Sequence, residues 1–298
     1  MLTYSIRRLA VALGAAVVIL QPNVCLLAAD GPEKATRRAT LKTASAATPD
    51  IPFQEYEFQV EQDLLQFANQ SRQRAGAQPL TLDAGLTAAA RIHAQAMLDA
   101  NQLSHQFSGE PALVHRLAAT TKLPLDQAAE NVALDYTAQA GHEHLMLSPP
   151  HRANLLNPAY NVVGLGVVRS GSRLFIVEDF AHAVPSYSTE QVKGRVAIAV
   201  NDMRHQGSRP ALPRSDLQSA DAAACSMAHE DKLGTTPVRQ LAQHYTVLTY
   251  TSLYPEKLPT EASRAIHSPN LRSFSVGACY ARTQTYPTGA YWIVLSLK

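Results

Sequence analysis

Glu130, His105 and His151 carry the side chains of this sequence best suited to acid-base or metal chemistry. Glu130 stands beside Asn131 in a run of small apolar residues. A buried carboxylate there needs hydrogen-bond donors, because an uncompensated charge out of water is expensive. His105 precedes it, and His151 follows a Pro-Pro pair that cannot continue a helix and so starts a new element. The sequence therefore predicts that two imidazoles and one carboxylate meet in one cleft.

Such a cluster has two chemical interpretations. Two imidazoles and a carboxylate suit Zn²⁺ or a similar divalent ion if the imidazoles are neutral and oriented by further partners, for which Ser104 and Asn131 are candidates. The same groups can instead form a closed hydrogen-bond network that holds the cleft walls together. We favour a network or a weak metal site over a catalytic metal, because no water-activating base beyond the ligands can be named. No cofactor is required by this interpretation.

The remaining histidines near this stretch have simpler explanations. His93 lies on the apolar face of a predicted helix, so we interpret it as a core histidine satisfied by a neighbour. His142, Glu143 and His144 are adjacent and point in different directions on any helix, which makes a solvated face their default position.

The elements that must position these residues follow from periodicity and turn residues. Apolar residues at helical spacing from Val60 predict a helix that ends near Gly76, and Asp83 is the predicted N-cap of a second helix. Residues 160–168 and 173–180 predict an antiparallel hairpin. Within its second strand, alternation predicts that either Glu178 or Asp179 faces the core.

Length and charge limit the classes of protein that this chain can be. Its 298 residues suffice for one large domain or two ordinary ones. A net charge of +2 gives no electrostatic case for a nucleic-acid partner.

The N-terminus has the composition of an export signal. Arg7-Arg8, an apolar run from Leu9 to Leu20 and small residues near Ala28-Ala29 predict a secretory signal peptide over residues 1–29. An uncleaved membrane anchor is the alternative. Residues 30–54 have no apolar period and predict a flexible linker. We therefore expect a secreted or periplasmic protein with no membrane segment after signal removal.

The second half of the sequence echoes the first, which predicts a domain over 55–184 and another over 185–298. Asn201 to Arg204 repeats the pattern of Asn69 to Arg72 at an offset of 204 − 72 = 132, and later segments repeat at offsets of 130 and 120. A nearly constant offset indicates internal duplication. In this alignment Leu271 stands opposite His151, and Thr235 opposite His105. The second domain therefore lacks the polar cluster.

Cys225 and Cys279 are the cysteines that remain after signal removal. One lies on a predicted helix and the other on a predicted strand. In an exported protein the pair forms either a disulfide that closes a long loop or two buried thiols.

Several motifs, taken in order, resemble one family. Ser104-His105, Glu130-Asn131, the segment SPPHRANLL from Ser148 and the segment VGLGVV from Val163 are similar to the bacterial form of the CAP superfamily. That superfamily contains cysteine-rich secretory proteins, antigen 5 and pathogenesis-related 1 proteins. The resemblance covers roughly residues 60–180.

The resemblance implies a fold and a set of site residues. It implies an α+β fold, an α-β-α sandwich, here in two tandem copies, with a cleft over the sheet. In many members two His and two acidic residues form a tetrad that holds a divalent metal in some of them. His105, Glu130 and His151 match three positions. The fourth lacks its usual context, since Leu145 replaces a common Trp, and the candidates for it are Glu143 and then Glu178.

The resemblance also implies a function. Family members have been credited with sterol, lipid and protein binding, so we expect non-enzymatic binding of a small apolar ligand or an extracellular partner through the His/Glu cleft of the first domain. The first alternative is a metal-dependent hydrolase, a peptidase with Glu130 as general base and His105 and His151 as ligands. The second is a structural protein of the cell envelope.

Overall fold

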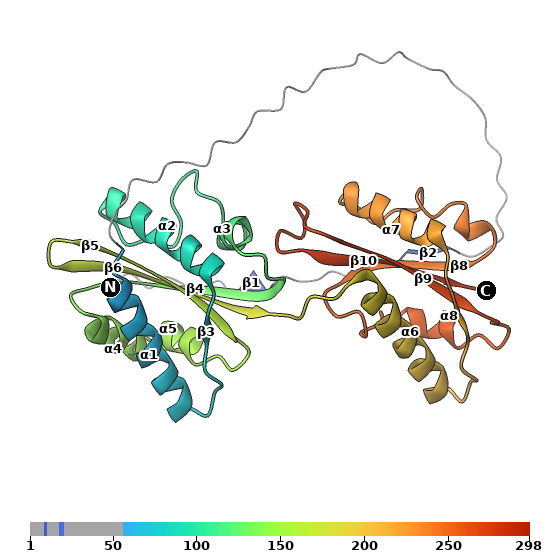
Figure 1. Ribbon diagram of the computed structural model, residues 1–298, viewed down its shortest axis with the longest axis horizontal. Helices are drawn as coiled ribbons and strands as arrows, with labels where there is room; N and C mark the ends of the chain where they lie inside the picture. The colour runs from blue at the N-terminus through green and yellow to red at the C-terminus, as the bar shows by residue number, and fades with distance from the viewer. Residues whose placement is uncertain (1–8, 11–17, 21–55) are drawn as a thin grey trace, which may run out of the picture.

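The structure, a computed structural model, describes residues 9–10, 18–20 and 56–298. Within them the chain forms two sheets, each with helices on both faces, that follow one another along the long axis of the molecule (Figure 1). We call residues 56–184 the N-terminal domain and residues 185–298 the C-terminal domain.

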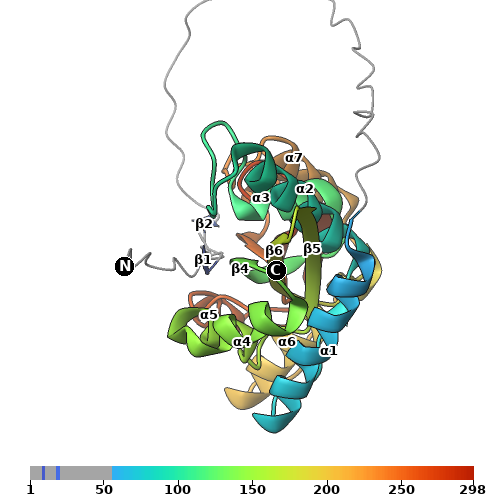
Figure 2. The same cartoon turned by 90° about the vertical axis from the view of Figure 1, so that its left-hand side faces the viewer.

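The N-terminal domain is a three-layer sandwich. Helices α2 (Ala84–Ala100) and α3 (Leu113–Thr120) cover one face of its sheet (Figures 1 and 2). The other face is covered by α1 (Phe58–Arg74), α4 (Ala138–Leu147) and α5 (Pro149–Leu155). The sheet has the order β1-β4-β6-β5-β3, and its strands are Leu9–Ala10, Leu125–Asp135, Arg173–Ala183, Val162–Ser170 and Thr81–Leu82. The α+β class and the α-β-α sandwich are thereby confirmed for this domain.

Local sequence signals fix the ends of these elements. The Asp83 side chain accepts a hydrogen bond from the Leu86 amide at 2.8 Å and so caps α2, as predicted. Asn101 ends that helix in the left-handed conformation, at φ 45°. The predicted hairpin forms between β5 and β6, with Gly171 at φ 60° in its turn.

Strand β5 lies directly under the backbone of α2. A Cβ atom added to Gly164 would lie 2.1 Å from the carbonyl carbon of Leu86, and one added to Gly166 would lie 2.2 Å from that of Ala90. Only glycine permits this approach. It places α2, and the loop that follows it, close over the sheet.

The C-terminal domain has the same strand order with fewer helices. Its sheet runs β2-β8-β10-β9-β7. The strands are Val18–Leu20, Thr246–Ser252, Ala290–Leu297, Phe274–Ala281 and Arg214–Ser215. The helices are α6 (Thr189–Gln206), α7 (Gln218–His229), α8 (Ala262–Ile266) and the 3-10 helix η1 (Leu241–Gln243).

Each domain is stabilised internally by the same pair of side-chain contacts. Asn69 donates to the Leu80 carbonyl at 3.0 Å, and Asn201 donates to that of Leu212 at 3.2 Å. Arg72 and Arg204 are both buried, and each donates from Nε to a backbone carbonyl six residues ahead at 2.7 Å. These are the motifs whose repetition predicts internal duplication.

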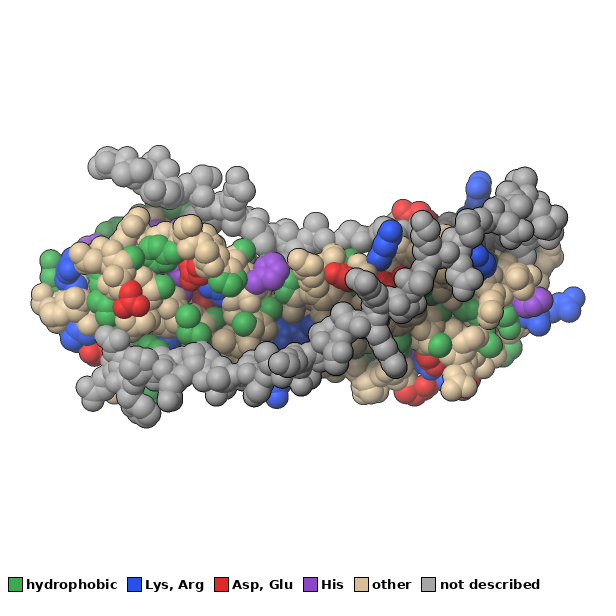
Figure 3. Space-filling view, turned by 90° about the horizontal axis from the view of Figure 1, so that it is seen from above, with side chains coloured by type: hydrophobic (Ala, Val, Ile, Leu, Met, Phe, Trp, Pro, Cys, Tyr) green, Lys and Arg blue, Asp and Glu red, His purple; other side chains and the backbone are tan. Residues whose placement is uncertain are grey.

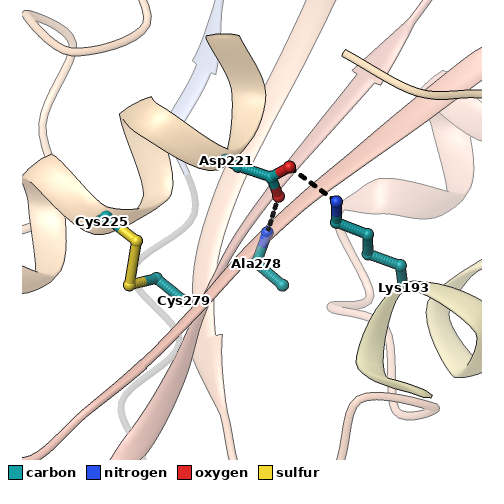
Figure 4. The surroundings of a disulfide bond; sticks show 5 residues. All are labelled: Lys193, Asp221, Cys225, Ala278 and Cys279. Atoms are coloured by element: carbon teal, nitrogen blue, oxygen red, sulfur yellow. Dashed lines mark hydrogen bonds and ion pairs between the residues drawn. A yellow bond between two sulfur atoms is a disulfide. The ribbon is translucent and has the colours of Figure 1, made fainter. Parts of the chain in front are cut away.

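One ion pair is reversed between the domains. Glu61 of α1 pairs with Arg91 of α2, whereas Lys193 of α6 pairs with Asp221 of α7 at 2.6 Å (Figure 4). In each domain the carboxylate also accepts from a strand amide, that of Val167 for Glu61 at 3.3 Å and that of Ala278 for Asp221 at 3.1 Å.

Cys225 of α7 and Cys279 of β9 form a disulfide that closes a separation of 54 residues (Figure 4). The bond ties α7 to the sheet beside Asp221. Of the two interpretations made from sequence, the structure has the disulfide.

The N-terminal segment is described only in part. Leu9–Ala10 pairs with β4 and Val18–Leu20 with β8. The rest of the predicted signal peptide and the predicted linker lie outside the described residues. Among the helices of residues 56–298, none has the length and apolar character needed to cross a membrane.

Candidate functional site

Glu130 lies at the centre of the polar cluster, on β4, and is 7% exposed. Its Oε1 accepts from Nδ1 of His105 at 2.9 Å, and its Oε2 accepts from the guanidinium of Arg116 on α3. Arg116 also donates to the His105 carbonyl at 3.3 Å. The carboxylate is therefore neutralised by a buried cation and bonded at both oxygens.

A second acid-imidazole pair supports the first. His93 of α2 is fully buried, with Nδ1 2.6 Å from Glu110 and Nε2 2.8 Å from the Ser104 carbonyl. The same Nε2 lies 3.8 Å from Glu130, and Glu110 lies 3.5 Å from Arg116. His93 is thus a core histidine satisfied by neighbours, as its helical position predicts, although those neighbours belong to the cluster.

His151, the first non-proline residue of α5, lies beside His105, and their ring centroids are 6.5 Å apart. Burial lowers the pKa of His151, and the nearby His105 lowers it further. The His151 carbonyl accepts from Asn131 at 3.2 Å, and Asn154 donates to Asn131 at 3.0 Å. The structure therefore brings His105, Glu130 and His151 to one place, with Asn131 orienting the backbone of α5.

Two adjacent acids of β6, Glu178 and Asp179, point to opposite faces of the sheet next to this cluster. Glu178 accepts from Asn131 at 3.1 Å, while within the described residues its other oxygen has no hydrogen-bond partner. Burial raises the pKa of Glu178 to about 7, against the bond from Asn131. Asp179 lies across from Glu130 in the sheet, and burial followed by the charge of Glu130 raises its pKa.

The expectation that only one of Glu178 and Asp179 faces the core is wrong. Both are fully buried. Strand β6 is central and has helices over both of its faces, so alternation sends its side chains into two different cores rather than one core and solvent.

Two predicted site residues have other positions. Ser104 contributes its carbonyl to His93, while its hydroxyl donates to the Gln106 carbonyl at 2.8 Å. Glu143 is exposed on α4 and accepts from Gln139 of the same helix at 2.8 Å. The structure does not bring Glu143 to the cluster, because α4 turns its side chain to solvent. Glu178, by contrast, is connected to the cluster by its hydrogen bond from Asn131.

Sequence reasoning missed Arg116 and Glu110. A usable signal existed for Arg116, which lies three residues after Leu113 on a short helix, so the two side chains share one face. Glu110 lies in a loop with no period, and its role follows only from the tertiary contact with His93.

The cluster does not fit a divalent metal as it is arranged. The guanidinium of Arg116 already occupies the Glu130 carboxylate, and a second cation there would be repelled. Within the described residues, no group of three or more His, Cys, Asp and Glu side chains is placed to share one ion. We derive no chemistry through a metal.

Comparison with known proteins assigns part of this chain to a family. A sequence model of the cysteine-rich secretory protein family, CAP, matches residues 65–180. Those residues form a CAP domain. The match includes α2, α3, the loop between them, β4 and α5, which together carry the polar cluster.

Three similar proteins each match less than half of this chain. The uncharacterized protein YkwD of Bacillus subtilis is 33% identical over 115 residues, which are 38% of this chain and 44% of that protein. An extracellular protein of Bacillus anthracis containing an SCP domain is 28% identical, with a TM-score of 0.38 over 47% of this chain and 45% of its own. An outer surface protein of Borrelia burgdorferi is 16% identical, with a TM-score of 0.40 over 42% of this chain and 94% of its own.

The strands of the C-terminal domain have no ionisable side chain at the positions that hold Glu130, Glu178 and Asp179 in the CAP domain. Its Gly277 and Ala278 correspond to Gly166 and Val167, an offset of 278 − 167 = 111, because each Gly underlies a helix and each following amide donates to the matched carboxylate. The two strand registers then place Val247 and Leu248 where the CAP domain has Glu130 and Asn131. Leu295 and Ser296 correspond to Glu178 and Asp179 by the same registers.

Replacing Glu178 by Gln tests the buried acid. Because folding raises the pKa of Glu178 from 4.5 to about 7, its protonation stabilises the fold at low pH, and this contribution is lost as pH rises through 7. At pH 8 we expect Glu178→Gln to be more stable than the parent by about 3 kcal/mol, a difference that narrows toward pH 5. Urea unfolding at both pH values measures it. The exposed Glu143→Gln is the control, and an equal effect at both pH values would refute the assignment.

Proposed function

We propose that this chain is an exported CAP-domain protein that binds a small apolar molecule or an extracellular partner through its N-terminal domain, without catalysis. One observation supports this above the others. Glu130, the residue that would serve as general base, is buried and bonded at both carboxylate oxygens to Arg116 and His105. A general base must reach the proton that it takes, and burial behind Arg116 and His105 keeps the Glu130 carboxylate from a substrate.

The exposed parts of the N-terminal domain near the polar cluster are suited to binding. The side chain of His105 is 37% exposed, and histidines reach the surface on the face covered by α2 and α3 (Figure 3). Helices α4 and α5 border an open hollow of about 330 Å³. It is lined by Met146, Leu147, Pro149, Arg152, Ala153 and Leu156. An open, mostly apolar hollow on the helix that carries His151 favours an apolar ligand.

Export and tandem organisation belong to the same proposal. The composition of residues 1–29 favours secretion or transport to the periplasm. Acidic and basic side chains are mixed on the part of the surface that Figure 3 shows, so no basic patch there suggests a nucleic-acid partner. We further propose that the C-terminal domain is a degenerate copy of the CAP domain. Three observations support this: the strand order is equal, the Asn and Arg contacts are matched, and no ionisable side chain stands at the corresponding strand positions.

A thermal-shift measurement tests binding. With a long-chain fatty acid and a sterol as probes, at about 100 times the dissociation constant, we expect one of them to stabilise the chain by about 2.7 kcal/mol. Leu147→Glu, which charges a side chain 79% exposed in the hollow, should abolish the shift. The control Ile198→Glu changes a residue 63% exposed on the C-terminal domain and should not. Metal-dependent peptide cleavage that is lost in a folded Glu130→Gln variant would instead establish a hydrolase.

A further inference from the structure

The C-terminal domain contacts the two elements that carry the central ion pair. Arg282, at the end of β9, donates to the Thr121 carbonyl at 3.0 Å and to the Ala118 carbonyl at 2.6 Å. Both carbonyls belong to the C-terminal end of α3, the helix of Arg116. Thr288, before β10, is buried and donates to the Leu125 carbonyl at 2.9 Å, at the start of the strand that carries Glu130. In Figure 1 the β9–β10 hairpin reaches toward α3.

Helix α3 depends on such external contacts. It has eight residues and no side-chain hydrogen bond at its N-cap. Short helices are marginal by themselves, and the last carbonyls of any helix have no partner within it. A cation placed there is bonded to these carbonyls and favoured by the helix dipole. Arg282 is held in this position by its Nε, which donates to the Pro287 carbonyl of its own hairpin at 2.8 Å.

Hydrogen bonds to Asp126 also hold the start of β4. Asp126, the residue after Leu125, accepts from His182 of β6 at 2.7 Å and from the hydroxyl of Tyr254 of the C-terminal domain. Contacts from the C-terminal domain therefore reach both α3 and β4 within a few residues of Arg116 and Glu130.

We infer that the C-terminal domain, which lacks the polar cluster, positions it: Arg282 and Thr288 hold α3 and β4 so that Arg116 meets Glu130 and His105. Arg282 is a positioning residue and acts through α3. This inference does not depend on which ligand the CAP domain binds.

The test compares variants of the whole chain. In Arg282→Ala we expect the amides of residues 113–120 to exchange with solvent about tenfold faster, because a charge-assisted bond to the helix end is lost. The His105 ring signals in NMR spectra should shift, because Arg116 binds its carbonyl. Arg282→Lys, which keeps the cation but not the fork, should recover part of both effects. Arg272→Ala, an exposed arginine of the same domain, is the matched control.

The outcomes separate the inference from a general loss of stability. A destabilised C-terminal domain would change exchange in β8 and β10, so the inference requires those strands to keep parental exchange while α3 and His105 change. It is overturned if folded Arg282→Ala has parental exchange in α3 and parental His105 signals, or if Arg272→Ala produces the same changes. If Arg282→Ala does not fold, the same comparison is made on Arg282→Lys.

Discussion

Replacing Arg116 by Met is expected to destabilise the CAP domain by roughly 3–5 kcal/mol, because the change leaves the Glu130 carboxylate buried without its cation. Hydrogen exchange in β4 and β6 measures the loss within this domain.

A double variant shows whether the loss of stability comes from the unpaired Glu130 charge or from the loss of Arg116 itself. Arg116→Met combined with Glu130→Leu removes both charges together, and apolar replacement of a buried ion pair is often neutral or stabilising. We expect it to recover most of the stability lost in Arg116→Met. The control Arg74→Met changes an exposed arginine of the same domain. If Arg116→Met has parental stability, or if the double variant recovers none of the loss, Arg116 and Glu130 do not form a buried ion pair that stabilises the domain.

Loss of the disulfide is expected to destabilise the C-terminal domain by about 4 kcal/mol, the value of the chain-entropy model for a loop of 54 residues. Cys225→Ser with Cys279→Ser removes the bond without relying on a reductant. Trp292, the single Trp of the chain, is buried and lies opposite Cys279 in the sheet. Its fluorescence during urea unfolding therefore reports on this domain.

The effect should stay within that domain. Exchange in α1 and β5 of the CAP domain should match the parent, since the disulfide joins α7 and β9 of the C-terminal domain. An unchanged fluorescence midpoint would mean that the bond does not constrain the unfolded chain, or that it does not form in solution.

The sequence predicted those features that depend on short-range signals. Asp83 as an N-cap and the turn at Gly171 follow from residue type alone, because each meets a local backbone requirement. The proximity of His105, Glu130 and His151 was predicted on other grounds. These were the position of an acid in an apolar run and the order of several motifs along the chain. Their separation in sequence shows that no local rule would have joined them.

The missed features depend on tertiary context. Arg116 and Glu110 acquire their roles only because α3 and the loop before it fold over β4. The burial of both Glu178 and Asp179 reflects helices on both faces of β6, which alternation within one strand cannot reveal. Glu143 was misplaced because the direction of α4 is set by its packing on α1. The reversed pair Lys193–Asp221 keeps a contact while exchanging its charges, so identity between the two halves underestimates their structural likeness.

The tautomer of His105 tests the central claim most directly. A Glu130 carboxylate that accepts from Nδ1 requires the hydrogen on that nitrogen, since the bond made by one ring nitrogen determines the state of the other. Long-range ¹H–¹⁵N spectra near pH 8 distinguish the two neutral forms. We predict hydrogen on Nδ1 and a bare Nε2. A His105 with hydrogen on Nε2 and a bare Nδ1 would mean that Glu130 is not bound by this imidazole, and would make its carboxylate a candidate base again.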